Sequence, residues 1–412
     1  MTADQRPAPV DHRSRLLAPD LARGMLLLFI AVANVWGYLY GRPTGYGWRP
    51  VDGSTVDRVV DGLVSFAVDD RSRPMFAILF GYGIATIAAR QAMRGVSRRS
   101  TTGVLVRRHL LLIVLGVLHA ALLFGGDILA AYGASGLVVL ALLHRRREVL
   151  VRWLWVSLAT MAAAGLFISA MGSGLVDVPV EEETVGYFPT MVERVVGVGV
   201  SMGLSAVALF FVSQMLIGVL IARAGWLDRP AEHTHQLRRV LWWALAANLV
   251  GNLPYALAVA GAWQPNPWVL VVIGELHLLS GVAMGLGYVC LFALVAVRLA
   301  DRRRTRGVQA VTALGERSLT GYLTQSLLMA PLLSVWGLGL GERLGTAQAT
   351  ALAVGVWLVT VAGAVALDRA GRRAPFEVLL RKVSYAGVRR RRASVDAPAV
   401  VLAEPLAEPD AV

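Results

Sequence analysis

Apolar stretches recur along the whole chain, and this feature constrains the fold most strongly. A helix needs about twenty mainly apolar residues to cross the hydrocarbon core of a bilayer, and these stretches have that length. Of the 412 residues, 56% are hydrophobic and only 16% are charged, and the alternation typical of a membrane barrel is absent. The sequence therefore predicts an all-α, polytopic membrane protein.

We expect about ten transmembrane helices in one bundle, with a shorter amphipathic segment near 55–69 that lies at the membrane interface or re-enters the membrane. No internal repeat and no separate soluble domain is evident. Residues 1–20 form an N-terminal segment, 21–370 the membrane domain, and 371–412 a basic tail whose end we expect to be disordered. The expected spans are 21–40, 74–93, 104–124, 127–144, 150–171, 203–223, 239–260, 272–298, 318–338 and 347–367.

Arginines gather in every second connection between these spans, which sets the topology. The basic connections begin at Arg90, Arg145, Arg223 and Arg298, and the tail ends its basic part at Arg389–Arg392. The alternate connections are acidic ("DVPVEEET", Asp177–Thr184) or neutral and aromatic ("GAWQPNPW", Gly261–Trp268). By the positive-inside rule both termini lie in the cytoplasm.

The net charge of +13 is thus explained by topology, so we expect the lipid bilayer as partner and no nucleic acid. Arg389–Arg392 would hold the tail on anionic headgroups. Cys290 is the one cysteine, which excludes an internal disulfide. We predict neither a metal nor a permanently bound cofactor, and the oligomeric state is not indicated.

Polar residues from several spans fall at one depth near the outer face. Each ionisable group in a span costs roughly 2–4 kcal/mol on insertion, so such groups normally face a cavity or a partner. We therefore predict an outward-facing polar pocket formed around His119, Asp127, Asn34 and Asp70. Its further residues are Asp69, Arg71, Asn248, Asn252, Glu275 and His277.

Each of these residues also has a structural interpretation. His119 can bond a closely packed neighbouring helix, and Asp127, in the turn "FGGD", can cap the fourth helix. Asn248 and Asn252 can join helices. Glu275 and His277 differ by about 200° around one helix, so they should face different neighbours. The common depth of the set, more than any single member, favours a site.

A second polar set lies near the inner face. It contains Asp20 and Arg23 at the start of the first span, and Arg317 and Gln325 in "GERSLTGYLTQS" (Gly315–Ser326). Arg23 or Arg317 could hold a cytosolic phosphate group, although arginines at helix ends commonly extend toward the headgroups instead.

Five sequence blocks resemble the YeiB-like bacterial membrane proteins, domain-of-unknown-function family 418. They are "RLLAPDLARGMLLLFIAVAN" (Arg15–Asn34), "FAILFGYGIA" (Phe76–Ala85), "GVLHAALLFGGDILAAYG" (Gly116–Gly133), "GERSLTGYLTQS", and "RAPFEVLLRKVSY" (Arg373–Tyr385). Those proteins are similar to the transmembrane acyltransferase superfamily, which includes the acyltransferase 3 proteins and the heparan-α-glucosaminide N-acetyltransferases. The resemblance implies acyl-CoA as co-substrate and an acceptor on the far side of the membrane.

The chain departs from that superfamily at the catalytic histidine. Arg23 matches the first-helix arginine of the acyltransferase 3 proteins, but Asn34 stands where they have the histidine, and no histidine lies between His12 and His109. We therefore expect His119 to serve as general base, oriented by Asp127.

The sequence favours an acyltransferase that acts on an extracytoplasmic or membrane-embedded glycan, lipid or secondary metabolite. A transporter or exporter of a small or amphipathic molecule is the alternative, with proton coupling through His119 and Asp127. Matching broken helices, which would favour a transporter, are not evident in the sequence. A non-catalytic membrane protein is the third interpretation.

Overall fold

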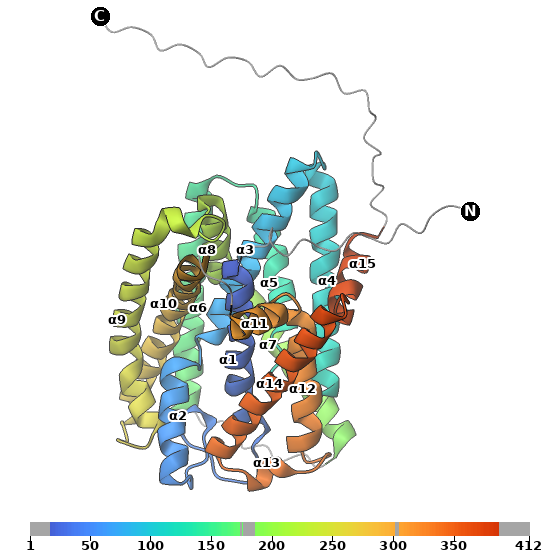
Figure 1. The fold of residues 1–412 in the computed structure, drawn as a ribbon. Helices are drawn as coiled ribbons and strands as arrows, with labels where there is room; N and C mark the ends of the chain where they lie inside the picture. Colours follow the sequence, from blue (N-terminus) through green and yellow to red (C-terminus); the bar gives the residue numbers. More distant parts are fainter. Residues whose placement is uncertain (1–16, 174, 176–185, 301–304, 387–412) are drawn as a thin grey trace, which may run out of the picture.

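The protein forms one bundle of α-helices, shown in Figure 1. The computed structural model describes residues 17–173, 175, 186–300 and 305–386. Within these ranges there is no β-strand, only an isolated bridge between Thr44 and Pro50. The expected acidic connection Asp177–Thr184, the arginines Arg302–Arg304 and the run Arg389–Arg392 lie outside the described residues.

Eight helical stretches among the described residues are long and apolar enough to cross a membrane, which confirms the all-α, polytopic prediction. They are α1 with η2 (Leu17–Val35, Trp36–Tyr38), α2 with α3 (Thr55–Ala67, Ser72–Met93), α4 (Arg98–Leu122), α6 (Arg147–Gly172), α7 (Tyr187–Val207), η4 with α9 (Pro230–His233, Thr234–Val259), α10 (Pro267–Ala300) and α14 (Thr346–Arg369). The remaining helices are η3 (Tyr46–Trp48), α5 (Leu129–Leu142), α8 (Val212–Ala224), α11 (Arg306–Gly315), α12 (Ser318–Leu333), α13 (Leu340–Arg343) and α15 (Pro375–Ser384).

The expected span 203–223 is the one whose boundaries differ most from the structure. α7 already begins at Tyr187, inside the stretch expected to be a connection, and α8 begins only at Val212. α7 was not expected because Glu193, Arg194 and several glycines interrupt its apolar residues. The spans expected at 127–144 and 318–338 contain the shorter helices α5, of 14 residues, and α12, of 16 residues.

Two crossings are broken helices. The segment expected at the interface is α2, which starts with a capping box formed by Ser54 and Asp57 and runs into α3 through a break at 68–71. α7 and α8 are separated by a similar break at 208–211. Each break contains a non-glycine residue with positive φ, Asp70 at 55° and Leu209 at 50°. This conformation is rare for such residues, so the surrounding packing must hold it.

The helices around the first break pack in the same order as the helices around the second break. α2 packs on α9 and α3 on α10, while α7 packs on α4 and α8 on α5. α3 and α8 meet each other at Gly81 and Gly218. A Cβ atom at Gly81 would lie 2.0 Å from the Met215 carbonyl oxygen, and one at Gly218 would lie 2.0 Å from that of Ile78. The units α2–α5 and α7–α10 thus share an arrangement that the sequence does not reveal.

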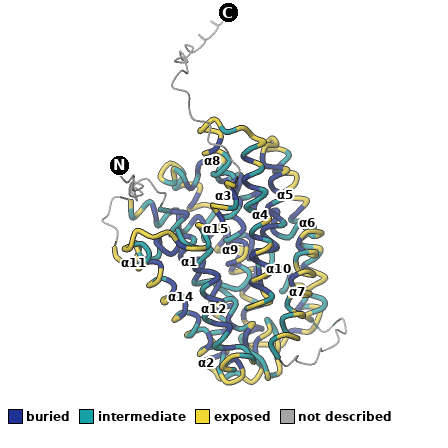
Figure 2. Tube along the Cα trace, turned by 90° about the vertical axis from the view of Figure 1, so that its right-hand side faces the viewer, coloured by how far each residue is buried: buried dark blue, intermediate teal, exposed yellow. Residues whose placement is uncertain are grey.

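Buried side chains line the centre of the bundle, as Figure 2 shows, and α1 contributes Leu26, Leu27 and Ile30 to its core. Large apolar side chains cover the outside, including Trp155, Trp242 and Val250, as expected of a surface in contact with lipid. The connections α3–α4, α5–α6 and α8–α9 carry Arg94, Arg145–Arg147 and Arg229. We call this end of the bundle, uppermost in Figure 1, the basic end.

Candidate functional site

The hairpin of α4 and α5 brings His119 and Asp127 together at the end of α4 that points away from the basic end. His119 lies in the last turn of α4, and Asp127 lies just before α5. Gly116 allows the two helices to approach closely, because a Cβ atom there would lie 2.3 Å from the backbone nitrogen of Ala130. A larger residue at position 116 would therefore separate the histidine from the carboxylate.

The Asp127 carboxylate is bound from three sides. Its Oδ1 lies 2.8 Å from His119 Nδ1, and its Oδ2 accepts the backbone N–H of Ala130 at 2.9 Å. The hydroxyl of Tyr322, on α12, donates to Oδ1 at 3.3 Å. Asp127 thus anchors the start of α5, as its structural interpretation predicts, and the same carboxylate contacts the imidazole of His119.

His119 presents its other ring nitrogen without a partner. Because the Asp127 carboxylate accepts a hydrogen bond, Nδ1 carries the proton and Nε2 keeps its lone pair. The side chain is only 1% exposed, and Nε2 has no hydrogen-bond partner in the described part of the chain. The ring of Tyr322 lies 5.0 Å from the imidazole, centroid to centroid. The imidazole is thus oriented by Asp127, and its second nitrogen is buried without a partner among the described residues.

A second polar cluster surrounds the break between α2 and α3. Arg71, at the break, is fully buried, and its guanidinium contacts Asn248 Oδ1 at 2.9 Å, Ser280 Oγ at 3.2 Å and His277 Nδ1 at 3.1 Å. Asp69 is bound by Arg49 at 2.7 Å. Asp70 contacts His277 Nε2 at 3.1 Å and also pairs with Arg73. These charges therefore neutralise and bind one another.

The asparagines of α9 complete this second cluster. Asn252 donates to the backbone oxygens of Ser65 and Phe66, at 3.1 and 2.9 Å, and its own oxygen lies 2.6 Å from His277 Nδ1. Helix ends leave backbone oxygens without intrahelical partners, and Asn252 supplies hydrogen bonds there. The geometry shows that Asp69, Asp70, Arg71, Asn252 and His277 meet, and that together they hold the helix break.

The tetrad proposed from the sequence is therefore divided. His119 and Asp127 form one cluster, and Asp70 belongs to the other, because α4 packs on α5 and α7 whereas the break packs on α9 and α10. The two clusters are neighbours, since the hydroxyl of Tyr132 on α5 donates at 2.8 Å to the backbone oxygen of Arg73, the ion-pair partner of Asp70. Asn34 is half-buried on α1 and makes no hydrogen bond to either cluster within the described residues.

Glu275 faces away from His277, as their spacing on α10 predicts. A Cβ atom at Gly165 of α6 would lie 2.5 Å from Glu275 Oε2, so this carboxylate points toward α6. Both of its oxygens are buried and without hydrogen-bond partners among the described residues.

The inner set does not form one cluster. Arg23 contacts Asp20 at 3.4 Å, whereas Arg317 pairs with Asp368 on α14 at 2.9 Å. Gln325 donates to the backbone oxygen of Leu27 at 3.1 Å. Arg108 of α4, counted in the sequence only among the basic connections, lies close enough to Arg23 for the two positive charges to repel each other. No group of three or more metal-ligating side chains is found among the described residues.

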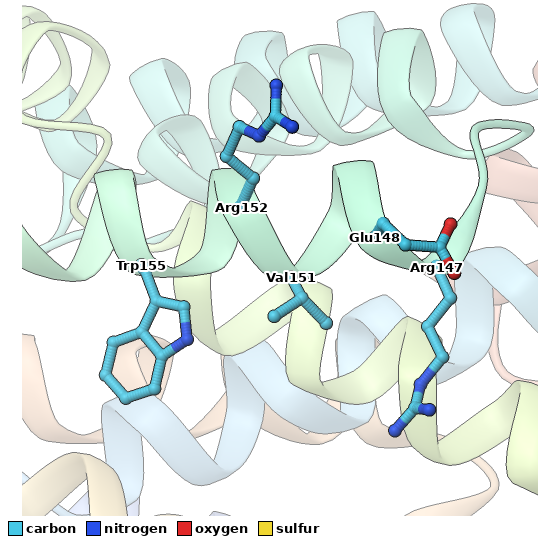
Figure 3. Close-up of a pocket in the computed structure, with 5 residues that line it drawn as sticks. All are labelled: Arg147, Glu148, Val151, Arg152 and Trp155. Carbon is cyan, nitrogen blue, oxygen red and sulfur yellow. The ribbon is translucent and has the colours of Figure 1, made fainter.

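An open groove lies at the basic end of α6, apart from both clusters. Its volume is about 480 Å³, and Figure 3 shows its residues Arg147, Glu148, Val151, Arg152 and Trp155. Arg147, Val151 and Trp155 point to one side of the helix and Arg152 to the other. Arginine and tryptophan together are typical of the headgroup region of a membrane.

Three residues beside His119 were missed from the sequence. Arg194 lies on α7, which was expected to be a connection, and Tyr38 lies in the short helix after α1. Tyr322 belongs to the quoted block "GERSLTGYLTQS", but its contact with Asp127 requires the packing of α12 against the α4–α5 hairpin. In the sequence, the hydroxyl of Tyr322 within an apolar helix was the feature that could have indicated this contact.

Comparisons with known proteins agree with the sequence blocks. Residues 221–387 match the family described as "Protein of unknown function (DUF418)". The chain is 28% identical over 394 residues to "Uncharacterized protein YeiB" of Escherichia coli (strain K12), covering 89% of this chain and 95% of YeiB. It is 23% identical over 411 residues to "Uncharacterized protein YxaH" of Bacillus subtilis (strain 168), covering 92% and 96%.

A shorter match, 31% identical over 143 residues, joins the chain to an "Uncharacterized 39.9 kDa protein in amylase 3'region" of Bacillus acidopullulyticus, with 35% of this chain and 38% of that protein covered. The matched family region contains His277, Arg317 and Tyr322, whereas His119 and Asp127 precede it. The resemblance expected from the sequence is thereby confirmed: the chain is related to YeiB and YxaH along most of its length and carries a DUF418 region at residues 221–387.

Proposed function

We propose that the protein is a membrane acyltransferase that moves an acyl group from acyl-CoA to a hydroxyl or amine of an extracytoplasmic or membrane-embedded glycan, lipid or secondary metabolite. The protein would lie in the bacterial cytoplasmic membrane with its basic end in the cytoplasm. The observation that supports this most is the buried His119, which is bound to Asp127 at Nδ1 and has no partner at Nε2.

The chemistry assigned to this pair is general acid–base catalysis. His119 Nε2 takes the proton from the acceptor hydroxyl while the acceptor oxygen attacks the thioester carbonyl carbon. The tetrahedral intermediate collapses, the carbon–sulfur bond breaks, and the thiolate of CoA takes the proton from Nε2. The products are the acyl ester and free CoA. Asp127 keeps the imidazole oriented and stabilises its protonated form, as the carboxylate does in other histidine pairs.

The donor would bind at the basic end. Arg23, Arg108 and Arg317 supply positive charge for the phosphates of CoA there, and Gln325 lies deeper, beside Leu27. Leu27, Ile30 and Leu323 belong to the main core cluster, and Leu27 and Ile30 follow Arg23 along α1. Passage of the acyl group therefore requires these side chains to move apart. We still predict that Asn34 and Glu275 contribute to binding of the acceptor.

Acyl-CoA turnover by purified protein in detergent tests the proposal. We expect release of free CoA in the presence of a hydroxyl-bearing acceptor, with a loss of roughly 10²–10⁴-fold in His119→Ala and in Asp127→Asn. The matched control is His235→Ala, because His235 is exposed at the start of α9 and should leave turnover unchanged. Failure to bind or consume any CoA ester would exclude the proposal.

A transporter is the second candidate, and one observation favours it. Interrupted helices occupy matching places in the units α2–α5 and α7–α10, which is typical of substrate sites in secondary transporters. Such a protein should move an amphipathic substrate into proteoliposomes under a proton gradient without consuming acyl-CoA. Transport that is lost in Asp70→Asn but unaffected by His119→Ala would assign the activity to the α2–α3 break rather than to the α4–α5 hairpin.

A further inference from the structure

Hydrogen-bond donors without partners gather near His119. The hydroxyl of Tyr38, Nη2 of Arg194 and Nε1 of Trp336 are buried atoms, and none has a hydrogen-bond partner among the described residues. A buried donor left without an acceptor costs free energy. The three come from the helix after α1, from α7 and from the residues after α12. Separate elements thus present donors to one region.

The hairpin turn that carries His119 and Asp127 also positions two of these donors. Arg194 donates from Nη1 to the backbone oxygen of Leu123 at 3.2 Å, and Leu123 in turn donates to the backbone oxygen of His119 at 2.9 Å. Arg194 is therefore attached one helical turn from His119. Tyr38 stacks on Phe124, the next residue, with ring centroids 4.6 Å apart.

The third donor, Trp336, and Arg194 both contact the ring of Tyr187. The guanidinium of Arg194 lies 5.6 Å from the ring centroid of Tyr187, and the same ring packs edge-on against Trp336 at 5.1 Å. The field of Arg194 also reaches Tyr38. The three donors therefore surround the outer side of the His119 hairpin.

The charge of Arg194 has no carboxylate counterion among the described residues. The neighbouring Glu193 is exposed. Asp127, the buried carboxylate of the same hairpin, already accepts hydrogen bonds from His119, Ala130 and Tyr322. An arginine within a membrane normally binds an anion or marks a substrate path.

We propose that Arg194, with Tyr38 and Trp336, binds a phosphate oxyanion of the acceptor and so places a nearby acceptor hydroxyl at Nε2 of His119. The acceptor is then an acidic, hydroxyl-bearing molecule. The placement of the hydroxyl rests on the proposed acyltransferase function, whereas the binding of the oxyanion rests only on the contacts of Arg194, Tyr38 and Trp336.

Paired probes that differ in one phosphate test the proposal by binding alone, without a CoA ester. Phosphatidic acid is compared with diacylglycerol in mixed micelles, and glycerol phosphate with glycerol in solution. A hydrogen-bonded charge pair predicts roughly tenfold or tighter binding of the phosphate-bearing member. If only the phosphate-bearing lipid binds more tightly than its partner, the ligand is a lipid headgroup. If the phosphate-bearing member binds more tightly in both pairs, the ligand is a free phosphate ester.

Variants show whether the preference for phosphate depends on Arg194 itself, on the net charge of the protein, or on the proposed acyl transfer. Arg194→Gln should remove the discrimination, and Arg194→Lys should keep part of it, while thermal unfolding shows that both variants are folded. Arg58→Gln, exposed on α2, removes one positive charge and should change nothing. His119→Ala should keep the discrimination even though acyl transfer is lost.

Two results would overturn the oxyanion site: equal binding within both probe pairs, or a preference that survives in Arg194→Gln. If no acyl transfer is found while the preference exists and depends on Arg194, the acyltransferase proposal fails and the oxyanion site stands.

Discussion

Arg71 and Arg194 are both arginines inside the bundle, but their surroundings assign them different roles. The guanidinium of Arg71 donates to Asn248, Ser280 and the backbone oxygen of Asp69, and the side chain is fully buried. Arg194 is bound only through Nε and Nη1, to backbone oxygens, and keeps a donor without a partner. A buried charge that is fully bound stabilises one arrangement of helices, whereas a partly bound one is available to a ligand.

At the same scale, Gly281 is required by the strained backbone of Asp70. A Cβ atom at position 281 would lie 2.2 Å from the Asp70 carbonyl oxygen, so Gly281→Ala should force α3 and α10 apart. We expect a loss of about 1–3 kcal/mol in the free energy of unfolding, as for other overpacked sites. The control is Gly355→Ala on α14, where no atom lies within 4 Å of the new methyl group. Equal thermal unfolding of the two variants in detergent would contradict the prediction.

The sequence predicts part of the site because a hairpin constrains its own residues. His119 and Asp127 flank one short turn, so their common depth follows from the span boundaries alone. Tyr38, Tyr322 and Arg194 approach the same turn from helices far away in sequence, and their contacts depend on how those helices pack. The separation of Glu275 from His277 was predictable because both lie on one helix.

Among the elements, the break between α2 and α3 depends on α9. Asn252 donates to the backbone oxygens of Ser65 and Phe66 and contacts His277. Asn252→Ala should leave these groups without partners and lower the free energy of unfolding by about 1–3 kcal/mol. The amide hydrogens of 68–72 should then exchange faster with deuterium. Gln264→Ala, at an exposed connection, serves as the control, and unchanged exchange in Asn252→Ala would assign the break to other contacts.

Long apolar helices were predictable because length and composition are local properties of the chain. The break at Leu209 was not, since Leu209, Phe210 and Phe211 include neither glycine nor proline. A contact from α6 supports it instead: the hydroxyl of Thr160 donates at 2.7 Å to the carbonyl oxygen of Ala208, which the break frees from the helix. Only the tertiary structure contains that information.

For the whole molecule, the topology is testable because Cys290 is a free, buried cysteine. In a Cys290→Ala background, Arg94→Cys reports on the basic end and Gln264→Cys on the opposite end, and both positions are exposed. A maleimide that cannot cross membranes should label position 264 in intact cells and position 94 only after the membrane is opened. Labelling of position 94 in intact cells would reverse the orientation used in the proposed function.

The contact between Gly81 and Gly218 limits how the units α2–α5 and α7–α10 can move. At each glycine the backbone of α3 or α8 lies directly against a carbonyl group of the other helix. At these two points, which we call the seam, no side chain separates the two backbones and could adjust its conformation. Separation or sliding would lose the contact at both points at once. A rotation about the seam would keep it, and this is the displacement by which the His119 hairpin and the α2–α3 break could be exposed in turn.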